Sequence, residues 1–276
     1  MINTHKIIIT PEKSVLSFWL ELWGYRDLFY FLAWRDFKVR YKQTVLGVVW
    51  AVIRPLLTML ILSVIFGHLA KLPSEGGAPY QIMVFSAMLP WYFFASTMQD
   101  SSQSLVTNAN MITKVYFPRL IIPISTLFVT TVDFLISLVI FFLMMAWLNF
   151  VPTLKIAWLP LFFLQAALSS IGMGLWLAAL TVSYRDFRHV VPFLLQIGLY
   201  VSPVAFSSGI IPEQWRQLYA LNPLVGVIDG FRWCLLDETV RLEWYNFDIS
   251  LASGLLLLIS GLWFFQRVER RFADII

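Results

Sequence analysis

Charge is scarce in this sequence: only 13% of its 276 residues are charged, whereas 59% are hydrophobic. A typical soluble domain is about 25% charged and about 45–50% apolar. The composition excludes an ordinary soluble domain and indicates an integral membrane protein. Residues 1–40 are too polar to hold the apolar core of a secretory signal peptide. We therefore expect the first apolar segment to remain in the protein as a membrane span.

Catalytic and metal-binding motifs are also missing. A single cysteine, Cys234, excludes an internal disulfide, and the three histidines lie far apart without metal-ligand spacing. No GxxxxGK[ST], HExxH, CxxC or GxSxG occurs. We predict no catalytic residue, no metal site and no bound cofactor on this chain. The IGMG stretch at 171–174 lacks the third glycine of a dinucleotide-binding loop, and it favours close helix packing.

What the sequence does contain is a series of long apolar segments. A membrane-spanning helix needs about 20 mostly apolar residues. Six segments qualify: 48–66, 80–98, 120–150, 158–182, 190–206 and 249–265. The third is too long for one crossing unless it is tilted or begins at the membrane interface. The expected fold is an all-α integral membrane protein with six transmembrane helices, and we expect residues 1–276 to form one transmembrane domain.

The distribution of positive charge predicts the orientation. Lysine and arginine concentrate before the first span, between the second and third spans, between the fourth and fifth, and after the sixth. Because loops rich in Lys and Arg stay on the cytoplasmic side, both termini are expected in the cytoplasm.

Residues 24–44 predict a helix that lies flat on the membrane. Apolar residues repeat there at helical spacing at Leu28, Phe31, Leu32 and Phe37 or Val39. Basic and aromatic residues accompany them, including Arg35, Lys38, Arg40 and Tyr41. This mixture is typical of an amphipathic helix in the membrane interface. The alternative is a soluble helix packed on its own protein.

Residues 108–118 predict a short cytoplasmic helix between two apolar segments. Asn108 or Asn110 can cap its start, and Pro118 can end it. Met111, Ile112, Val115 and Tyr116 fall on neighbouring ridges of this helix. Two turns of helix are not stable in water alone, so the segment needs a partner surface. That surface is either a separate protein or the ends of the chain's own spans.

The segment 207–247, expected on the outer side, contains two helix starts. Pro212 can begin one helix, and Asn222 can cap a second that begins at Pro223. The second is apolar but too short to cross, which suits a re-entrant helix. The Gly226 and Gly230 pair fits close packing or a flexible helix equally well.

Two charged residues lie inside apolar segments. Asp133 is an acid deep in the third span, and a hydrogen-bonded structural role is favoured over proton transfer because no partner acid is apparent. Arg54, directly before Pro55, can extend to the lipid headgroups and anchor the first span.

Several stretches, taken in order, resemble one protein family. They are 34–56 (WRDFKVRYKQTVLGVVWAVIRPL), 108–119 (NANMITKVYFPR), 183–204 (SYRDFRHVVPFLLQIGLYVSPV), 211–232 (IPEQWRQLYALNPLVGVIDGFR) and the C-terminal VERRFADII. Together they resemble the membrane permease subunit of ATP-binding-cassette exporters of lipid-linked polysaccharides. These are the O-antigen exporters, with capsule and teichoic-acid exporters as relatives.

The resemblance implies a transport subunit of the bacterial inner membrane rather than an enzyme. It implies a homodimer bound to two ATPase subunits, which hold ATP and Mg²⁺, and a channel for a polysaccharide on a polyprenyl lipid. Nucleic acid is not an expected partner. The resemblance marks residues that contact the ATPase: Met111, Ile112, Lys114, Val115, Tyr116 and Arg119, with Tyr184, Arg185, Asp186 and Arg188. Alternatives are a permease for a drug or a small lipid, or a membrane transferase.

Two further sets of residues follow from the expected channel. Sugar rings stack on aromatic side chains, so the cluster Trp91, Tyr92, Phe93 and Phe94 is predicted to line the channel; ordinary packing is the alternative. A wide channel must also be closed at its outer end. We predict that the two short outer helices close it, with bulk supplied by Trp215, Leu218, Tyr219 and Phe231; a segment that only caps the bundle is the alternative.

Overall fold

The computed structural model describes residues 23–42, 47–236, 239–269 and 272. This part of the chain contains helices and no strand, so the all-α prediction is confirmed for it. The α-helices are α2 Arg26–Lys42, α3 Gly47–Leu62, α4 Tyr80–Thr107, α5 Ala109–Lys114, α6 Ile121–Trp147, α7 Leu159–Ser183, α8 Phe187–Val201, α9 Glu213–Tyr219, α10 Pro223–Leu235 and α11 Trp244–Glu269. The C-terminal residues 270–271 and 273–276, which include most of the last resembling stretch, lie outside the described residues.

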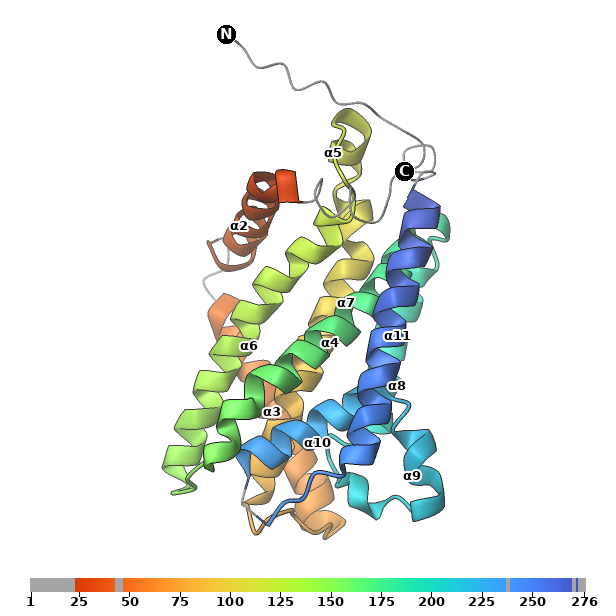
Figure 1. Cartoon of the computed structure of the whole chain (residues 1–276). Helices are drawn as coiled ribbons and strands as arrows, with labels where there is room; N and C mark the ends of the chain where they lie inside the picture. Colours follow the sequence, from red (N-terminus) through yellow and green to blue (C-terminus); the bar gives the residue numbers. More distant parts are fainter. Residues whose placement is uncertain (1–22, 43–46, 237–238, 270–271, 273–276) are drawn as a thin grey trace.

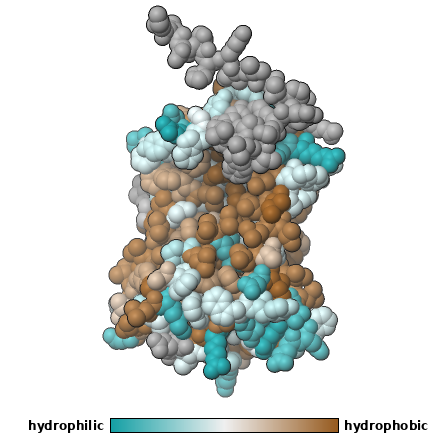
Figure 2. Space-filling model, viewed as in Figure 1, coloured by the Kyte–Doolittle hydropathy of each residue, from teal (hydrophilic) through white to brown (hydrophobic). Residues whose placement is uncertain are grey.

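The helices form an elongated bundle with distinct ends. Figure 1 shows α5 at one end, near the C-terminal end of α11, and α9 and α10 at the other. We call these the α5 end and the α9 end. An apolar belt separates two polar ends on the face shown in Figure 2. Such a belt matches the hydrocarbon layer of a membrane.

Four stretches are long and apolar enough to cross a membrane. They are Val52–Leu69, Ile121–Trp147, Leu154–Ser183 and Trp244–Glu269. The other two predicted spans, 80–98 and 190–206, correspond to α4 and α8, which are not long and apolar enough. Helix α8 has only 15 residues, and α4 has 28 residues but a polar second half. Six spans were predicted, and four are supported by length and composition.

Helix boundaries differ from the predicted spans in instructive places. The first span continues beyond α3 as a π-helical segment, Ser63–Leu69. The second extends to Thr107, because α4 continues through a run of serines that hydrogen-bond within the bundle. The long third segment is one unbroken helix of 27 residues. At 1.5 Å per residue it measures about 40 Å, which exceeds a hydrocarbon core of about 30 Å.

Helix α4 forms the centre of the bundle, with α3, α6, α7, α8 and α10 packed around it. Hydroxyl pairs join α4 to α6: Thr97 donates to Thr130 (2.8 Å), and the Ser101 and Thr126 oxygens lie 2.9 Å apart. Small hydroxyl residues let helices approach closely in a membrane and satisfy each other's hydrogen bonds.

The contact between α7 and α11 depends on glycine. A Cβ added to Gly172 would lie 2.6 Å from the backbone nitrogen of Leu258, and one on Gly261 would lie 2.4 Å from the Gly172 carbonyl oxygen. Trp176 donates to the Ser260 hydroxyl at 3.1 Å beside this crossing. The prediction that the IGMG stretch serves helix packing is confirmed.

Candidate functional site

The short helix α5 forms at the predicted place but by different local chemistry. Asn108 occupies the N-cap position, yet its side-chain amide donates back to the Ser104 carbonyl (2.8 Å) instead of capping α5. The helix ends at Lys114, before Pro118, because Val115 adopts an extended backbone. The chain then returns to the bundle at α6 (Figure 1).

The four apolar side chains of this segment divide into two groups. Val115 and Tyr116 are 58% and 53% exposed, whereas Ile112 is only 5% exposed. Ile112 packs into a cluster with Leu105 and Phe117. The prediction that Ile112 faces a partner is therefore wrong, because it fastens α5 to its own bundle. Met111 packs against the same cluster as a half-buried residue.

Among the charged residues of the segment, Lys114 is exposed, but Arg119 is engaged within the chain. Its backbone nitrogen donates to the Glu269 carboxylate (2.9 Å), and its guanidinium donates to the Glu269 carbonyl. Its side chain also lies over the Phe272 ring, 5.9 Å from the centroid. Arg119 therefore ties the start of α6 to the end of α11, and is not a free contact for a partner.

The connection between α7 and α8 lies at the same end as α5 (Figure 1). All four predicted contact residues there are exposed: Tyr184, Arg185, Asp186 and Arg188. The Nε of Arg188 donates to the Arg185 carbonyl (3.1 Å), which orders the turn. Val115, Tyr116 and this turn are thus all exposed at the α5 end, and we call them together the α5-end surface.

Helix α2 is held to the bundle by an ionic cluster. The Arg40 guanidinium lies 2.9 Å from the Asp100 carboxylate on α4 and 2.8 Å from the Asp133 carboxylate on α6. The Tyr41 hydroxyl donates to the other Asp133 oxygen. One turn of α2 therefore links three helices. Asp133 has the hydrogen-bonded structural role that was predicted, although its partners come from α2.

The rest of α2 combines both alternatives considered for it. Leu32 is fully buried, and the Phe37 ring packs edge-on against Phe128 of α6. Tyr30 and Trp34 are nevertheless 64% and 40% exposed. Two of the predicted basic residues make contacts within α2: Arg35 pairs with Asp36 (2.7 Å), and the Lys38 amine lies 5.5 Å from the centre of the Trp34 ring. The helix packs on its own protein and also exposes an aromatic stripe typical of membrane interfaces.

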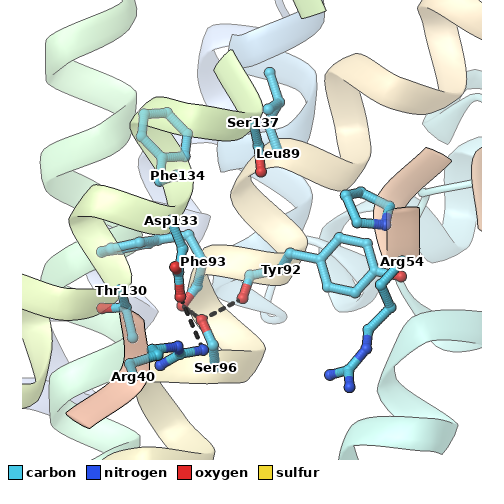
Figure 3. Close-up of a pocket in the computed structure, with 11 residues that line it drawn as sticks. Arg40, Arg54, Leu89, Tyr92, Phe93, Ser96, Thr130, Asp133, Phe134 and Ser137 are labelled. Carbon is cyan, nitrogen blue, oxygen red and sulfur yellow. Dashed lines mark hydrogen bonds and ion pairs between the residues drawn. The ribbon is translucent and has the colours of Figure 1, made fainter. Parts of the chain in front are cut away.

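A cavity of about 220 Å³ lies beside the ionic cluster, between α2, α3, α4 and α6. Arg40, Asp133 and Arg54 line it together with Phe93 and Phe134. Figure 3 shows the two guanidinium groups at one end of the cavity and Phe134, Leu89 and Ser137 at the other. The cavity is therefore cationic at one end and mostly apolar at the other.

The aromatic cluster predicted to line a channel is mainly core. Trp91, Phe93 and Phe94 are 4%, 2% and 7% exposed, and Phe93 packs against Phe134 and Phe163. The prediction is wrong for these three rings within this chain, except that Phe93 contributes to the cavity wall. Tyr92 is half-buried and donates to Thr58 on α3 at 2.8 Å.

The α9 end contains a fully buried arginine. Arg232 of α10 donates to the Phe206 and Val204 carbonyls (2.9 and 3.1 Å), and it lies 3.6 Å from the Glu75 carboxylate. It therefore joins α10 to the α8–α9 connection and to the loop before α4. Burial raises the pKa of Asp229 to about 7, although the neighbouring Arg232 acts in the opposite direction.

The four residues predicted to close the outer end are separated by the fold. Trp215 and Leu218 on α9 are 54% and 58% exposed. Tyr219 donates to the Val201 carbonyl at the end of α8 (2.8 Å). Phe231 is fully buried and packs edge-on against Phe134, so its predicted place in the closure is wrong. Asn222 caps α10 as predicted, accepting from the Leu224 backbone nitrogen at 3.1 Å.

The sequence of this bundle matches a known family. A family model described as "ABC-2 type transporter" covers residues 27–236, which is most of the chain. The chain belongs to the ABC-2 type transporter family. Within this family the absence of a phosphate-binding loop is expected, because an ABC permease is a transport subunit and a separate partner hydrolyses ATP.

Three relatives of this ABC-2 permease are informative. It is 28% identical over 251 residues to the O-antigen export system permease protein RfbA of Klebsiella pneumoniae, covering 91% of this chain and 95% of the relative. It is 26% identical over 214 residues to the protein of the same name from Myxococcus xanthus, covering 77% and 81%. It is 25% identical over 246 residues to the polysialic acid transport protein KpsM of Escherichia coli, covering 85% and 91%.

No role was predicted for two charged residues that the bundle engages. Asp100 lies beyond the predicted second span, 80–98, but α4 carries it to the ionic cluster. Arg232 lies in the predicted outer segment, 207–247, but it is buried. In both cases a signal existed: a charged residue inside an otherwise apolar or hydroxyl-rich helix needs a partner in the bundle.

Proposed function

We propose that the chain is the channel-forming permease half of an ATP-driven exporter that moves polyprenyl-linked polysaccharide of the O-antigen type across the bacterial inner membrane. The similarity to the O-antigen export permease of K. pneumoniae, which covers nearly the whole of both chains, carries this proposal. The α5-end surface supports it, because a transport subunit without ATP chemistry needs an exposed contact for its ATPase.

The assembly belongs to the same proposal. Two copies of the permease bind two ATPase subunits at the α5 end, which then faces the cytoplasm together with both termini. ATP and Mg²⁺ bind on the ATPase. Helix α8 supports a dimer, since it is too short to span and it exposes Phe193, Ile197 and Tyr200.

A capsule-type polymer is the second candidate substrate, and the similarity to the polysialic acid transport protein favours it. The two candidates are separated by purifying the permease with its ATPase and measuring ATP hydrolysis. Lipid-linked O-antigen should stimulate hydrolysis, and a capsular polymer on its own lipid should not. Stimulation by the capsular polymer alone would reverse the assignment.

The α5-end surface gives the first testable prediction. Val115→Asp should reduce recovery of the ATPase with the permease by about tenfold, because an unpaired charge would be desolvated in the contact. The measurement is co-purification from membranes with equal amounts of permease.

Val151→Asp is the matched control for this variant. Val151 is even more exposed (81%), and it lies in the α6–α7 connection at the opposite end of the bundle. It should leave recovery of the ATPase unchanged. Undiminished recovery with Val115→Asp would contradict the docking proposal. Ile112 is unsuitable for this test because its burial would confuse docking with folding.

The exposed face of α9 gives a second prediction, on closure of the channel. Alanine at both Trp215 and Leu218 should raise the resting ion permeability of liposomes that contain the permease, since these side chains supply the exposed bulk of α9. Trp147→Ala is the control. Trp147 is 86% exposed and is the last residue of α6. Helix α6 ends at the same end of the bundle as α9, but on the opposite side of it (Figure 1). Equal ion flux in all three proteins would reject closure by α9.

A further inference from the structure

We propose that the cavity beside the ionic cluster binds the phosphate group of a membrane lipid, with Arg54 as its principal ligand. This inference deepens the proposed function, because a lipid-linked polysaccharide carries such a phosphate. It rests on the structure of the cavity, however, and applies to any lipid that presents the same group.

The position of Arg54 is the first observation. It lies two residues inside the apolar stretch Val52–Leu69, near the end of the span toward α5. A charge at this depth is costly unless it meets a partner or reaches the headgroup layer. Lipid phosphates lie in that layer, so an arginine here can reach them.

The second observation is that the guanidinium of Arg54 is unpaired. Among the described residues no carboxylate lies within ion-pair distance of it and no hydrogen bond from it is formed. The nearby Thr58 hydroxyl donates to the Arg54 backbone carbonyl (3.0 Å) and accepts from Tyr92 (2.8 Å), so neither hydrogen bond involves the guanidinium. Figure 3 shows the Arg54 guanidinium set apart from the Arg40–Asp133 pair. All its N–H donors are therefore available to a ligand.

The acid that shares the cavity is already neutralised. One oxygen of Asp133 accepts from Tyr41, and the other pairs with Arg40 at 2.8 Å. Asp100, the second carboxylate of the cluster, does not line this cavity. Among the described residues that line the cavity, the charged group without a partner is thus a cation, which favours an anionic ligand. An arginine fork matches the oxygens of a phosphate and binds them in pairs.

The surface next to Arg54 suits a lipid chain. Leu57 and Ile61 follow at three and seven residues along α3, on the same helical face, and each is 53% exposed. A lipid whose phosphate contacts Arg54 would lay its hydrocarbon chain along these two side chains. Free phosphate would gain only the ionic contact, so the geometry selects a lipid phosphate.

Native mass spectrometry of the purified full-length permease tests this site. The probes are a polyisoprenyl phosphate, phosphatidylglycerol, the phosphate-free polyisoprenol and inorganic phosphate. We expect the wild type to retain at least one phosphate-bearing lipid about tenfold better than the polyisoprenol, as one charge-assisted contact predicts. Arg54→Gln should abolish this preference, and Arg54→Lys should keep part of it.

Arg35→Gln is the matched control, because Arg35 pairs with its neighbour Asp36 and does not line the cavity. It should retain lipids as the wild type does. Equal retention of phosphate-bearing lipids by Arg54→Gln, with an unchanged melting temperature, would overturn the proposal, and so would equal retention of the polyisoprenol by the wild type. Preference for phosphatidylglycerol would support the site and identify a phospholipid as its occupant. Because the ATPase and transport are absent from this assay, failure of the proposed export function leaves its outcome unaffected.

Discussion

Gly172→Ala should lower the melting temperature of the purified permease by several degrees. The added Cβ would lie 2.6–2.7 Å from backbone atoms of Leu257 and Leu258, and backbone cannot move aside as a side chain can. Overpacking of this kind costs about 1–3 kcal/mol. Helices α7 and α11 would have to separate, and the hydrogen bond from Trp176 to Ser260 would be strained with them.

Gly24→Ala makes the same chemical change in open space, since nothing lies within 4 Å of the added Cβ. Alanine also favours helix more than glycine does, so this variant should melt at the wild-type temperature or slightly above it. An unchanged melting temperature for Gly172→Ala would mean that α7 and α11 are not packed at this crossing.

The helical class, the four supported spans and the glycine contact could be predicted from the sequence because they follow from local composition. Apolar length identifies a span, and a glycine pair inside a span indicates a close crossing. The cap at Asn222 was predictable for the same reason, since the residues that form it are neighbours in the chain.

Burial within the bundle could not be predicted, because it depends on which helices meet. Ile112, Phe231 and Trp91 are apolar residues in short or aromatic-rich segments, and their sequence neighbourhoods do not distinguish a docking face from a core. The ionic cluster shows the same limit: Arg40 and Asp133 are 93 residues apart, and only the packing of α2 on α6 brings them together.

Arg40→Met should loosen α2 from the bundle and weaken export. Arg40 bridges the Asp100 and Asp133 carboxylates. The Asp133 side chain is only 17% exposed. Without Arg40, the Tyr41 hydroxyl is the one of these partners that Asp133 keeps. A deeply buried pair broken on one side costs about 3–5 kcal/mol, but the Arg40 side chain is 40% exposed. Solvent screening reduces the expected loss to about 1–3 kcal/mol. Hydrogen exchange of α2 amides should rise accordingly.

A double-mutant cycle separates this linkage from a general loss of stability. Asp133→Asn removes the charge but keeps an oxygen that can accept from Tyr41, so adding it to Arg40→Met should restore part of the protection of α2. Arg40→Lys should protect the α2 amides from hydrogen exchange less well than the wild type does, because an ammonium cannot reach two carboxylates as a planar guanidinium does. Arg35 lies on the same helix and pairs with its neighbour Asp36, so Arg35→Met should leave the hydrogen exchange of α2 unchanged. Strictly additive effects of Arg40→Met and Asp133→Asn would show that the two residues do not stabilise α2 through each other. If the double variant regains both the protection of α2 and export, export requires this helix to be held against α4 and α6.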